Sequence, residues 1–310
     1  MSYLALAFLS LLWGTSFLMI KIASQSFDSA TFAFGRAGIA AAALALAMLA
    51  MGRAWPRSPR LWGKMALLAV AGQTAPFLLF GAAARMTTSA DMALMMGAVP
   101  IFTFVAARFF GLGEVWNARA ALGLALGLIG VAIALASPAG PQSAVVAPSP
   151  GLGRALALIG ACGYGTGALL SRGVSKEIGA AMTATGSMLI STALLFVLVL
   201  AVDGPPSPVA LFATPTGPLA ALFALGLFNT GLAYFVYFEL IAVAGATFAA
   251  LNNYIVPCLG MIAGAWALGE PVAAGSLIGL ACVLGGVVLT GTAANSARVI
   301  AARVAQAKPK

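Results

Sequence analysis

The sequence contains no histidine, and charged residues make up only 7% of its 310 positions. The lack of histidine removes Ser/His and Cys/His nucleophile pairs and the commonest metal ligand. The three aspartates, Asp28, Asp91 and Asp203, are all expected near helix ends, so no aspartyl dyad forms in the middle of a span. An enzyme is therefore not predicted, and neither a cofactor nor a metal is expected.

Cysteine is also scarce. Cys162, Cys258 and Cys282 lie in apolar segments and have neither metal-ligand nor redox spacing. They are predicted to be buried structural thiols.

Apolar residues make up 62% of the chain, with a mean hydropathy of +1.05, whereas soluble domains are about 45–50% apolar. Crossing about 30 Å of hydrocarbon takes about 20 helical residues, while barrel strands would alternate apolar and polar residues. The stretch AGIAAAALALAMLAM (37–51) is apolar all round, which favours helices. The prediction is an all-α membrane protein with ten transmembrane helices, near 3–24, 29–50, 62–84, 89–110, 116–137, 152–173, 181–202, 217–242, 246–268 and 271–294.

The net charge of +9 would suit nucleic-acid binding, but the distribution of charge argues against it. No Lys or Arg occurs between Ile178 and Ala297. With the N-terminus in the cytoplasm, 12 of the 16 basic residues fall at cytoplasmic loops or ends, so the positive-inside rule predicts that both termini are cytoplasmic. The four that fall on the outer side are Lys21, Arg36, Arg85 and Arg154.

An internal repeat divides the chain into two halves. At an offset of 151, WGTSFLMIK (13–21) aligns with YGTGALLSR (164–172), and at an offset of 156, LGE (112–114) recurs at 268–270. Each half holds five predicted helices, and because five is odd the halves must cross the membrane in opposite directions. Such inverted repeats are typical of secondary transporters, whose substrate site lies near the midplane between the halves. The predicted domains are 1–137 for the first repeat, 138–151 for a periplasmic linker, 152–294 for the second repeat and 295–310 for a cytoplasmic basic tail.

Several paired motifs resemble one transporter family. WGTSF (13–17), FGR (34–36) and the paired blocks that begin VPIF (99–102) and VPCL (256–259) are similar to the EamA-type ten-helix branch of the drug/metabolite transporter superfamily, to about residue 292. The resemblance implies an exporter of amino acids or other metabolites in the bacterial inner membrane. The sixth helix departs from the first, because it reads YGTG where the first reads WGTS.

Polar residues recur at equivalent depth in the two halves. Asn252 and Asn253 precede Pro257, and carboxamides in mid-span are expensive if they face lipid. Interhelical hydrogen bonds, and interfacial positions for the tyrosines, are the alternative explanation. The predicted lining of a central cavity, with amide, aromatic and thioether groups, is Trp13, Thr15, Gln73, Thr74, Met95, Met96, Tyr164, Asn229, Tyr234, Tyr237, Asn252 and Asn253.

Arg36 is the favoured residue for attracting a substrate carboxylate. It lies deeper in its span than Lys21 and Arg85, which are expected to snorkel to the interface. No carboxylate is predicted deep in a span, and Glu239 is the least certain of those near helix ends.

Two features should shape the helices themselves. Pro100 and Pro257 each remove a helical hydrogen bond and clash with the carbonyl four residues back, so each predicts a kink. The freed carbonyl needs a new partner in a bilayer, so a kink either shapes packing or faces a wet cavity. A G-x-x-x-G spacing at 123–127 and again at 275–279 predicts close backbone contact of the fifth and tenth helices.

The sequence therefore predicts a secondary transporter that exports small zwitterionic metabolites, namely amino acids with apolar or aromatic side chains, by alternating access. An exporter of lipophilic cationic drugs, which would need a carboxylate such as Glu239, and a channel for small solutes are the alternatives. The expected partners are membrane lipid and a small-molecule substrate, with no nucleic acid, and a monomeric chain is compatible with this hypothesis.

Overall fold

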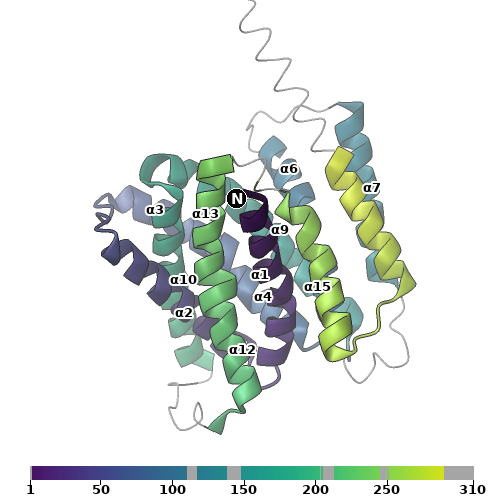
Figure 1. Cartoon of the computed structure of the whole chain (residues 1–310), viewed down its shortest axis with the longest axis horizontal. Helices are drawn as coiled ribbons and strands as arrows, with labels where there is room; N and C mark the ends of the chain where they lie inside the picture. Colours follow the sequence, from purple (N-terminus) through teal and green to yellow (C-terminus); the bar gives the residue numbers. More distant parts are fainter. Residues whose placement is uncertain are drawn as a thin grey trace, which may run out of the picture.

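The structure is a computed structural model that describes residues 2–109, 117–137, 148–202, 204, 213–244, 249 and 251–289. This part of the chain forms a bundle of helices without a strand (Figure 1). The predicted linker centre (138–147) and the predicted tail (295–310) lie outside the described residues.

The first half forms five spans. Two of them are composite: α3, η1 and α4 run on as Pro59–Ala84, and α5 and α6 together cover Ser89–Phe109. The elements are α1 (Ser2–Ala23), α2 (Ser29–Ala50), α3 (Pro59–Ala69), the π-helix η1 (Val70–Thr74), α4 (Ala75–Ala84), α5 (Ser89–Met96), α6 (Val99–Phe109) and α7 (Ala118–Ala136).

The second half repeats this order. Its elements are α9 (Pro150–Ile178), α10 (Ala180–Val202), α12 (Thr216–Gly226), the π-helix η2 (Leu227–Leu232), α13 (Ala233–Ala244), α15 (Asn252–Leu268) and a last helix, Ala274–Leu289. Seven helical segments of the described chain are long and apolar enough to cross a membrane. The prediction of an all-α membrane protein with ten helices in two inverted five-helix repeats is confirmed.

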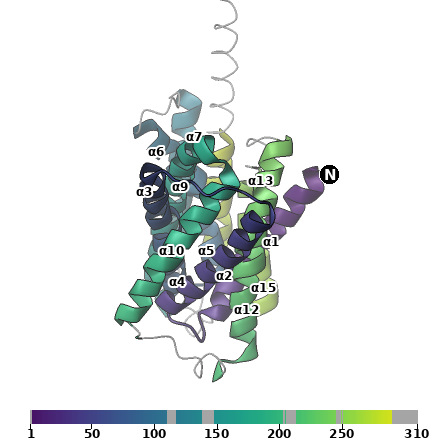
Figure 2. The ribbon, with the colours of Figure 1, turned by 90° about the vertical axis from the view of Figure 1, so that its left-hand side faces the viewer.

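The two halves interlock through equivalent pairs of helices. The contact of α1 with α15 has its counterpart in that of α9 with α6, and the contact of α1 with α13 corresponds to that of α9 with α4. A third contact between the halves joins α2 to its own repeat partner, α10. These two helices lie together on the face turned to the viewer in Figure 2. Each half therefore completes the packing of the other.

Polar caps and one glycine define several helix ends. The Asp28 carboxylate accepts from the backbone N–H groups of Ala30 and Thr31, at 2.8 and 3.0 Å, and so satisfies donors that α2 leaves free at its start. Asn117 caps α7 in the same way. At the end of α15, Gly269 adopts the left-handed conformation with φ of 62°, which stops the helix.

The prolines act differently in the two halves. Pro257 lies inside α15, where it deprives the carbonyl of Asn253 of its helical partner. Pro100 lies in the first turn of α6, just after a break in the helix at Gly97 and Ala98. A first-turn proline removes no helical hydrogen bond, because the first N–H groups of a helix have no intrahelical partner.

The cysteines correct one expectation. Cys162 is exposed, and Cys258 and Cys282 are partly exposed, so the prediction that all three are buried is wrong. Because the helices are apolar on all sides, the sequence does not mark which face of each helix points outward to lipid.

The last helix packs on α7 at the edge of the bundle, away from α2 and α10 (Figure 1). A Cβ atom added at Gly130 would lie 2.6 Å from the carbonyl oxygen of Gly279, and one at Gly286 would lie 2.4 Å from that of Gly123. Only glycine permits backbones to approach so closely. This contact agrees with the prediction that the fifth and tenth helices permit close backbone approach.

Gly130→Ala will lower the melting temperature of the detergent-solubilised protein. The new methyl group meets backbone atoms rather than a flexible side chain, and such overpacking costs about 1–3 kcal/mol. Gly63→Ala is the matched control, because a Cβ there meets nothing within 4 Å. Equal melting temperatures for the two variants would contradict the tight contact, and substrate selectivity is expected to stay unchanged in both.

Candidate functional site

Trp13 forms an aromatic cluster with two tyrosines of the second half. Its ring centroid lies 6.2 Å from that of Tyr234, in an edge-on arrangement, and 5.2 Å from that of Tyr237. Trp13 lies on α1 and both tyrosines lie on α13, one helical turn apart. We call these three residues the Trp13 cluster.

Tyr164, the repeat equivalent of Trp13, forms a second aromatic cluster. Its ring centroid lies 6.4 Å from that of Phe77 and 5.8 Å from that of Phe80, both on α4. We call these three residues the Tyr164 cluster. Because α9 and α4 are the counterparts of α1 and α13, the inverted repeat places one aromatic cluster in each of two equivalent positions.

Arg36 lies between the two clusters. Its guanidinium carbon is 4.0 Å from the centroid of the Phe77 ring, and its Nε donates a hydrogen bond of 3.2 Å to Oγ1 of Thr230. The guanidinium also forms a side-chain hydrogen bond with Tyr164 and is close enough to Tyr234 to interact with it electrostatically. We call Arg36, Phe77, Tyr164, Thr230 and Tyr234 the arginine site.

The charge of Arg36 is not balanced within this site. The residue is only 7% exposed, and its Nη1 has no hydrogen-bond partner among the residues that the structure describes. The ion pairs of the same residues involve Lys64 and Arg154, not Arg36. A buried cation without a counter-ion is costly, which makes Arg36 a candidate for a functional position within its membrane span.

The two π-helices position the polar residues around the site. η1 and η2 occupy repeat-equivalent places, and a π-bulge inserts an extra residue that turns side chains toward a new direction. In η2, the hydroxyl of Thr230 donates a hydrogen bond of 2.8 Å to the carbonyl oxygen of Leu225, five residues earlier in the chain. This geometry holds Oγ1 of Thr230 in place for Arg36.

The remaining polar residues of the π-helices pair with the opposite half. Gln73 Nε2 donates to Ser187 Oγ at 2.9 Å, and the hydroxyls of Thr74 and Ser191 lie 2.8 Å apart. Asn229 Nδ2 donates to Thr15 Oγ1 at 3.0 Å and to the carbonyl oxygen of Leu12. These contacts are interhelical hydrogen bonds between α10 and η1 and between α1 and η2.

The repeat also shows that Arg36 breaks the symmetry. At the offset of 151 its equivalent is Ser187, a neutral residue already bonded to Gln73. One half therefore contributes a cation where the other contributes a hydroxyl.

The other predicted residues lie in the contact between α5 and α15. Met95 is fully buried and Met96 is partly buried on α5. On α15, Asn252 is buried and its Oδ1 lacks a partner among the described residues, while Asn253 is half-buried. Sequence analysis missed Phe77, because it is one of many apolar residues on α4 and nothing in the sequence distinguishes it.

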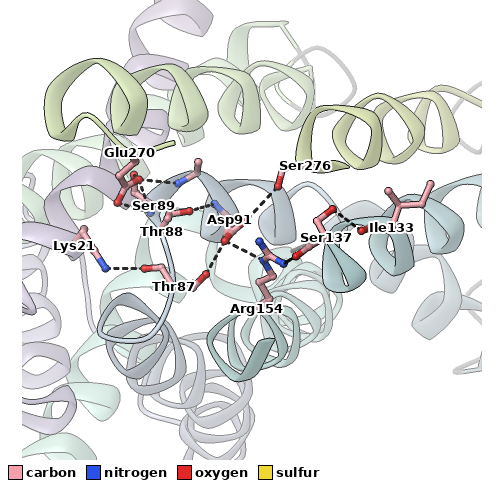
Figure 3. Close-up of polar contacts among 11 residues, drawn as sticks. Lys21, Thr87, Thr88, Ser89, Asp91, Ile133, Ser137, Arg154, Glu270 and Ser276 are labelled. Carbon is pink, nitrogen blue, oxygen red and sulfur yellow. Dashed lines mark hydrogen bonds and ion pairs between the residues drawn. The ribbon is translucent and has the colours of Figure 1, made fainter. Parts of the chain in front are cut away.

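A second polar group joins seven helix ends and was not predicted as a unit. We call it the end cluster (Figure 3). It brings together the ends of α1, α4, α7 and α15 and the beginnings of α5, α9 and the last helix. Its main side chains are Lys21, Thr87, Ser89, Asp91, Ser137, Arg154, Glu270 and Ser276.

The expectation that the Lys21 side chain snorkels to the interface is wrong. It is only 8% exposed, and its Nζ donates to the carbonyl oxygens of Ala84 and Thr87, both at 2.7 Å. The end of α4 leaves such carbonyls without helical partners, and a cation stabilises them. Arg85, in contrast, is exposed.

The carboxylates of the end cluster are fully engaged. Asp91 accepts from Thr87 Oγ1 at 2.7 Å and pairs with Arg154 Nε at 3.0 Å. Glu270 accepts from the backbone N–H of Ser89 at 2.8 Å and from its hydroxyl at 2.6 Å, which caps the start of α5. Two cations and two anions thus balance, and the cluster ties the second half to the first.

The two polar groups differ in their charge balance. The end cluster is neutral overall, as expected of structural ion pairs, and each of its charged side chains has a partner, although Nε of Arg154 meets Asp91 as an ion pair without a hydrogen bond. The arginine site holds one buried cation with an unused donor. Within the described part of the chain, Glu239 is exposed and does not provide a counter-charge.

Two interlocked, inverted five-helix halves are the architecture expected of a multi-pass membrane transporter of small solutes. The chain belongs to the EamA-like transporter family, whose model matches residues 1–136 and 151–292. This is a family of transporters, not of enzymes. The resemblance drawn from the sequence motifs is thereby confirmed.

The sequence was also compared with solved structures and with curated proteins. Among solved structures, one crystal structure, named only as that of a protein, is 19% identical and matches with a TM-score of 0.63, over 95% of this chain and 98% of that chain. The likeness at this identity concerns the fold alone. No curated protein matches this sequence.

Proposed function

We propose that the protein is a secondary transporter that exports small zwitterionic metabolites, namely amino acids with apolar or aromatic side chains, from the cytoplasm across the bacterial inner membrane. The observation that carries this proposal is the buried Nη1 of Arg36, which has no partner in the described chain. A guanidinium binds a carboxylate with two parallel hydrogen bonds, and such charge-assisted bonds are among the strongest in proteins.

The aromatic residues around Arg36 suit the rest of such a substrate. Phe77, Tyr164 and Tyr234 offer ring faces for an apolar or aromatic side chain. Trp13 and Tyr237 extend this apolar wall on the other side of Tyr234. A substrate with a carboxylate at one end and an apolar body would therefore fit better than a polar metabolite.

In an alternating-access cycle, each of the two aromatic clusters would close the substrate path to one side of the membrane. Phe80 lies four residues before the end of α4, next to the end cluster, whereas Tyr237 lies seven residues before the end of α13. In an inverted repeat, equivalent helices end on opposite sides of the membrane. The Tyr164 cluster would thus close the path to one side and the Trp13 cluster the path to the other.

A cationic-drug exporter is not proposed, because it would require a carboxylate facing the site. The described carboxylates are capping groups, ion-pair partners or, for Glu239, exposed.

Counterflow in proteoliposomes tests the proposal. Vesicles loaded with an unlabelled apolar or aromatic amino acid are expected to accumulate the labelled form transiently and with saturation, because a carrier exchanges substrate through one site. A channel would give no counterflow. Failure of every amino acid to drive or inhibit exchange would refute the proposed cargo.

The proposed orientation has a separate test. Topology reporters fused at Arg57 and at Gly140 should report opposite sides of the membrane, with Arg57 in the cytoplasm, because three predicted spans, an odd number, lie between the two positions. If both fusions report the same side, the proposed topology is refuted.

A further inference from the structure

The arginine site contains one fixed charge. Arg36 contacts the Phe77 ring and the hydroxyls of Thr230 and Tyr164, and Tyr234 lies within electrostatic range, so its described neighbours are all neutral groups. Every carboxylate in the described chain is engaged or exposed elsewhere: Asp28 caps α2, Asp91 pairs with Arg154, Glu177 pairs with Lys64, Glu270 caps α5 and Glu239 is exposed.

The second half does not add a compensating anion. The repeat equivalent of Arg36 is Ser187, and its hydroxyl already accepts from Gln73. The equivalents of the aromatic residues are likewise neutral. The described site therefore carries a net positive charge before the substrate arrives.

This charge balance treats the two ends of an amino acid unequally. The carboxylate gains a counter-ion that is already buried and desolvated, so the site becomes neutral on binding. The ammonium would lose its water and be repelled by Arg36, and although ring faces and hydroxyls attract a cation, they offer it no counter-ion. A molecule with the same body and the carboxylate alone avoids that cost.

We infer that the arginine site recognises the carboxylate and not the ammonium, so that the transporter also binds and carries apolar and aromatic monocarboxylates that lack an amino group. Unsubstituted, 2-hydroxy and 2-oxo acids with a branched or aromatic body are the chemical class. This inference rests on the proposed function, because it concerns the same site and assumes that Arg36 holds the substrate.

Two matched triplets of probes test it with the full-length protein. L-Phenylalanine, 3-phenylpropionate and 2-phenylethylamine share one body and carry both groups, the carboxylate alone and the ammonium alone. L-Leucine, 4-methylpentanoate and 3-methylbutylamine form the aliphatic triplet. Binding is measured as a melting-temperature shift in detergent and as inhibition of amino-acid counterflow, because a protonated acid can cross the bilayer without a carrier.

The acids are expected to bind at least as tightly as the amino acids, and the amines at least about tenfold more weakly, which is the effect of one lost charge-assisted contact. Arg36→Gln should remove the binding of both acids and amino acids. Exposed Arg85 provides the control, and Arg85→Gln should leave both unchanged.

The outcomes separate the inference from the proposed function. If an amino acid binds and its acid binds about tenfold more weakly or not at all, the ammonium is recognised and the inference alone is refuted. If an amine binds as well as its acid, both statements are refuted. If no member of either triplet binds, the proposed cargo fails and the inference fails with it.

Discussion

Arg36→Gln will abolish substrate exchange while the protein folds normally. Loss of one partner of a buried, hydrogen-bonded charge pair costs about 2–5 kcal/mol, so substrate affinity should fall by about 30-fold to several thousand-fold. The folded protein should be as stable as the wild type or more stable, because the variant removes a buried charge that has no carboxylate partner in the described chain.

The measurement is counterflow in proteoliposomes, together with a melting curve of each variant. Arg36→Lys keeps the charge but loses the planar fork, and should therefore retain weak exchange. Arg85→Gln is the matched control, since that arginine is exposed. Normal exchange by Arg36→Gln would remove Arg36 from the substrate site.

The Asp91–Arg154 pair should have the largest effect on stability. Both side chains are buried, at 6% and 4% exposure, and Asp91→Asn leaves the guanidinium of Arg154 without its anion. Breaking one side of a buried ion pair costs about 3–5 kcal/mol. The loss should appear as a lower melting temperature and a lower folded yield.

The Lys64–Glu177 pair is the matched control for this experiment. Its side chains are 38% and 46% exposed, and an exposed pair contributes about 0–1 kcal/mol. Lys64→Gln should therefore melt close to the wild type. A melting temperature of Asp91→Asn as high as that of Lys64→Gln would show that the end cluster does not hold the two halves together.

Replacing Asp91 and Arg154 together distinguishes the stability that the ion pair contributes from the cost of leaving one buried charge unpaired. The double variant should recover part of the stability lost in Asp91→Asn, because no unpaired ion remains. Substrate selectivity should remain that of the wild type, since both residues lie outside the arginine site.

The architecture could be predicted from the sequence because it depends on local properties of the chain. Span number follows from the length of apolar runs, and inversion follows from an odd number of helices per repeat. Trp13, Tyr164 and Arg36 could be selected for the same reason: an aromatic or charged residue deep in an apolar helix stands out in the sequence itself.

Contacts between distant segments could not be predicted in this way. Phe77 is one of many apolar residues on its helix, and only the packing of α4 against α2 and α9 places it against Arg36 and Tyr164. Lys21 looked like a residue near an interface, yet it stabilises the end of another helix. In both cases the deciding partner is more than 40 residues away along the chain.

The sequence by itself thus determined that this protein crosses the membrane in ten helices and consists of two opposed halves, because hydrophobic length and repetition act along the chain. Only the tertiary structure decided which charges are balanced. Asp91, Arg154 and Glu270 find partners where helix ends meet, whereas Arg36 does not among the described residues. Burial makes an unpaired charge costly, and burial depends on packing in three dimensions.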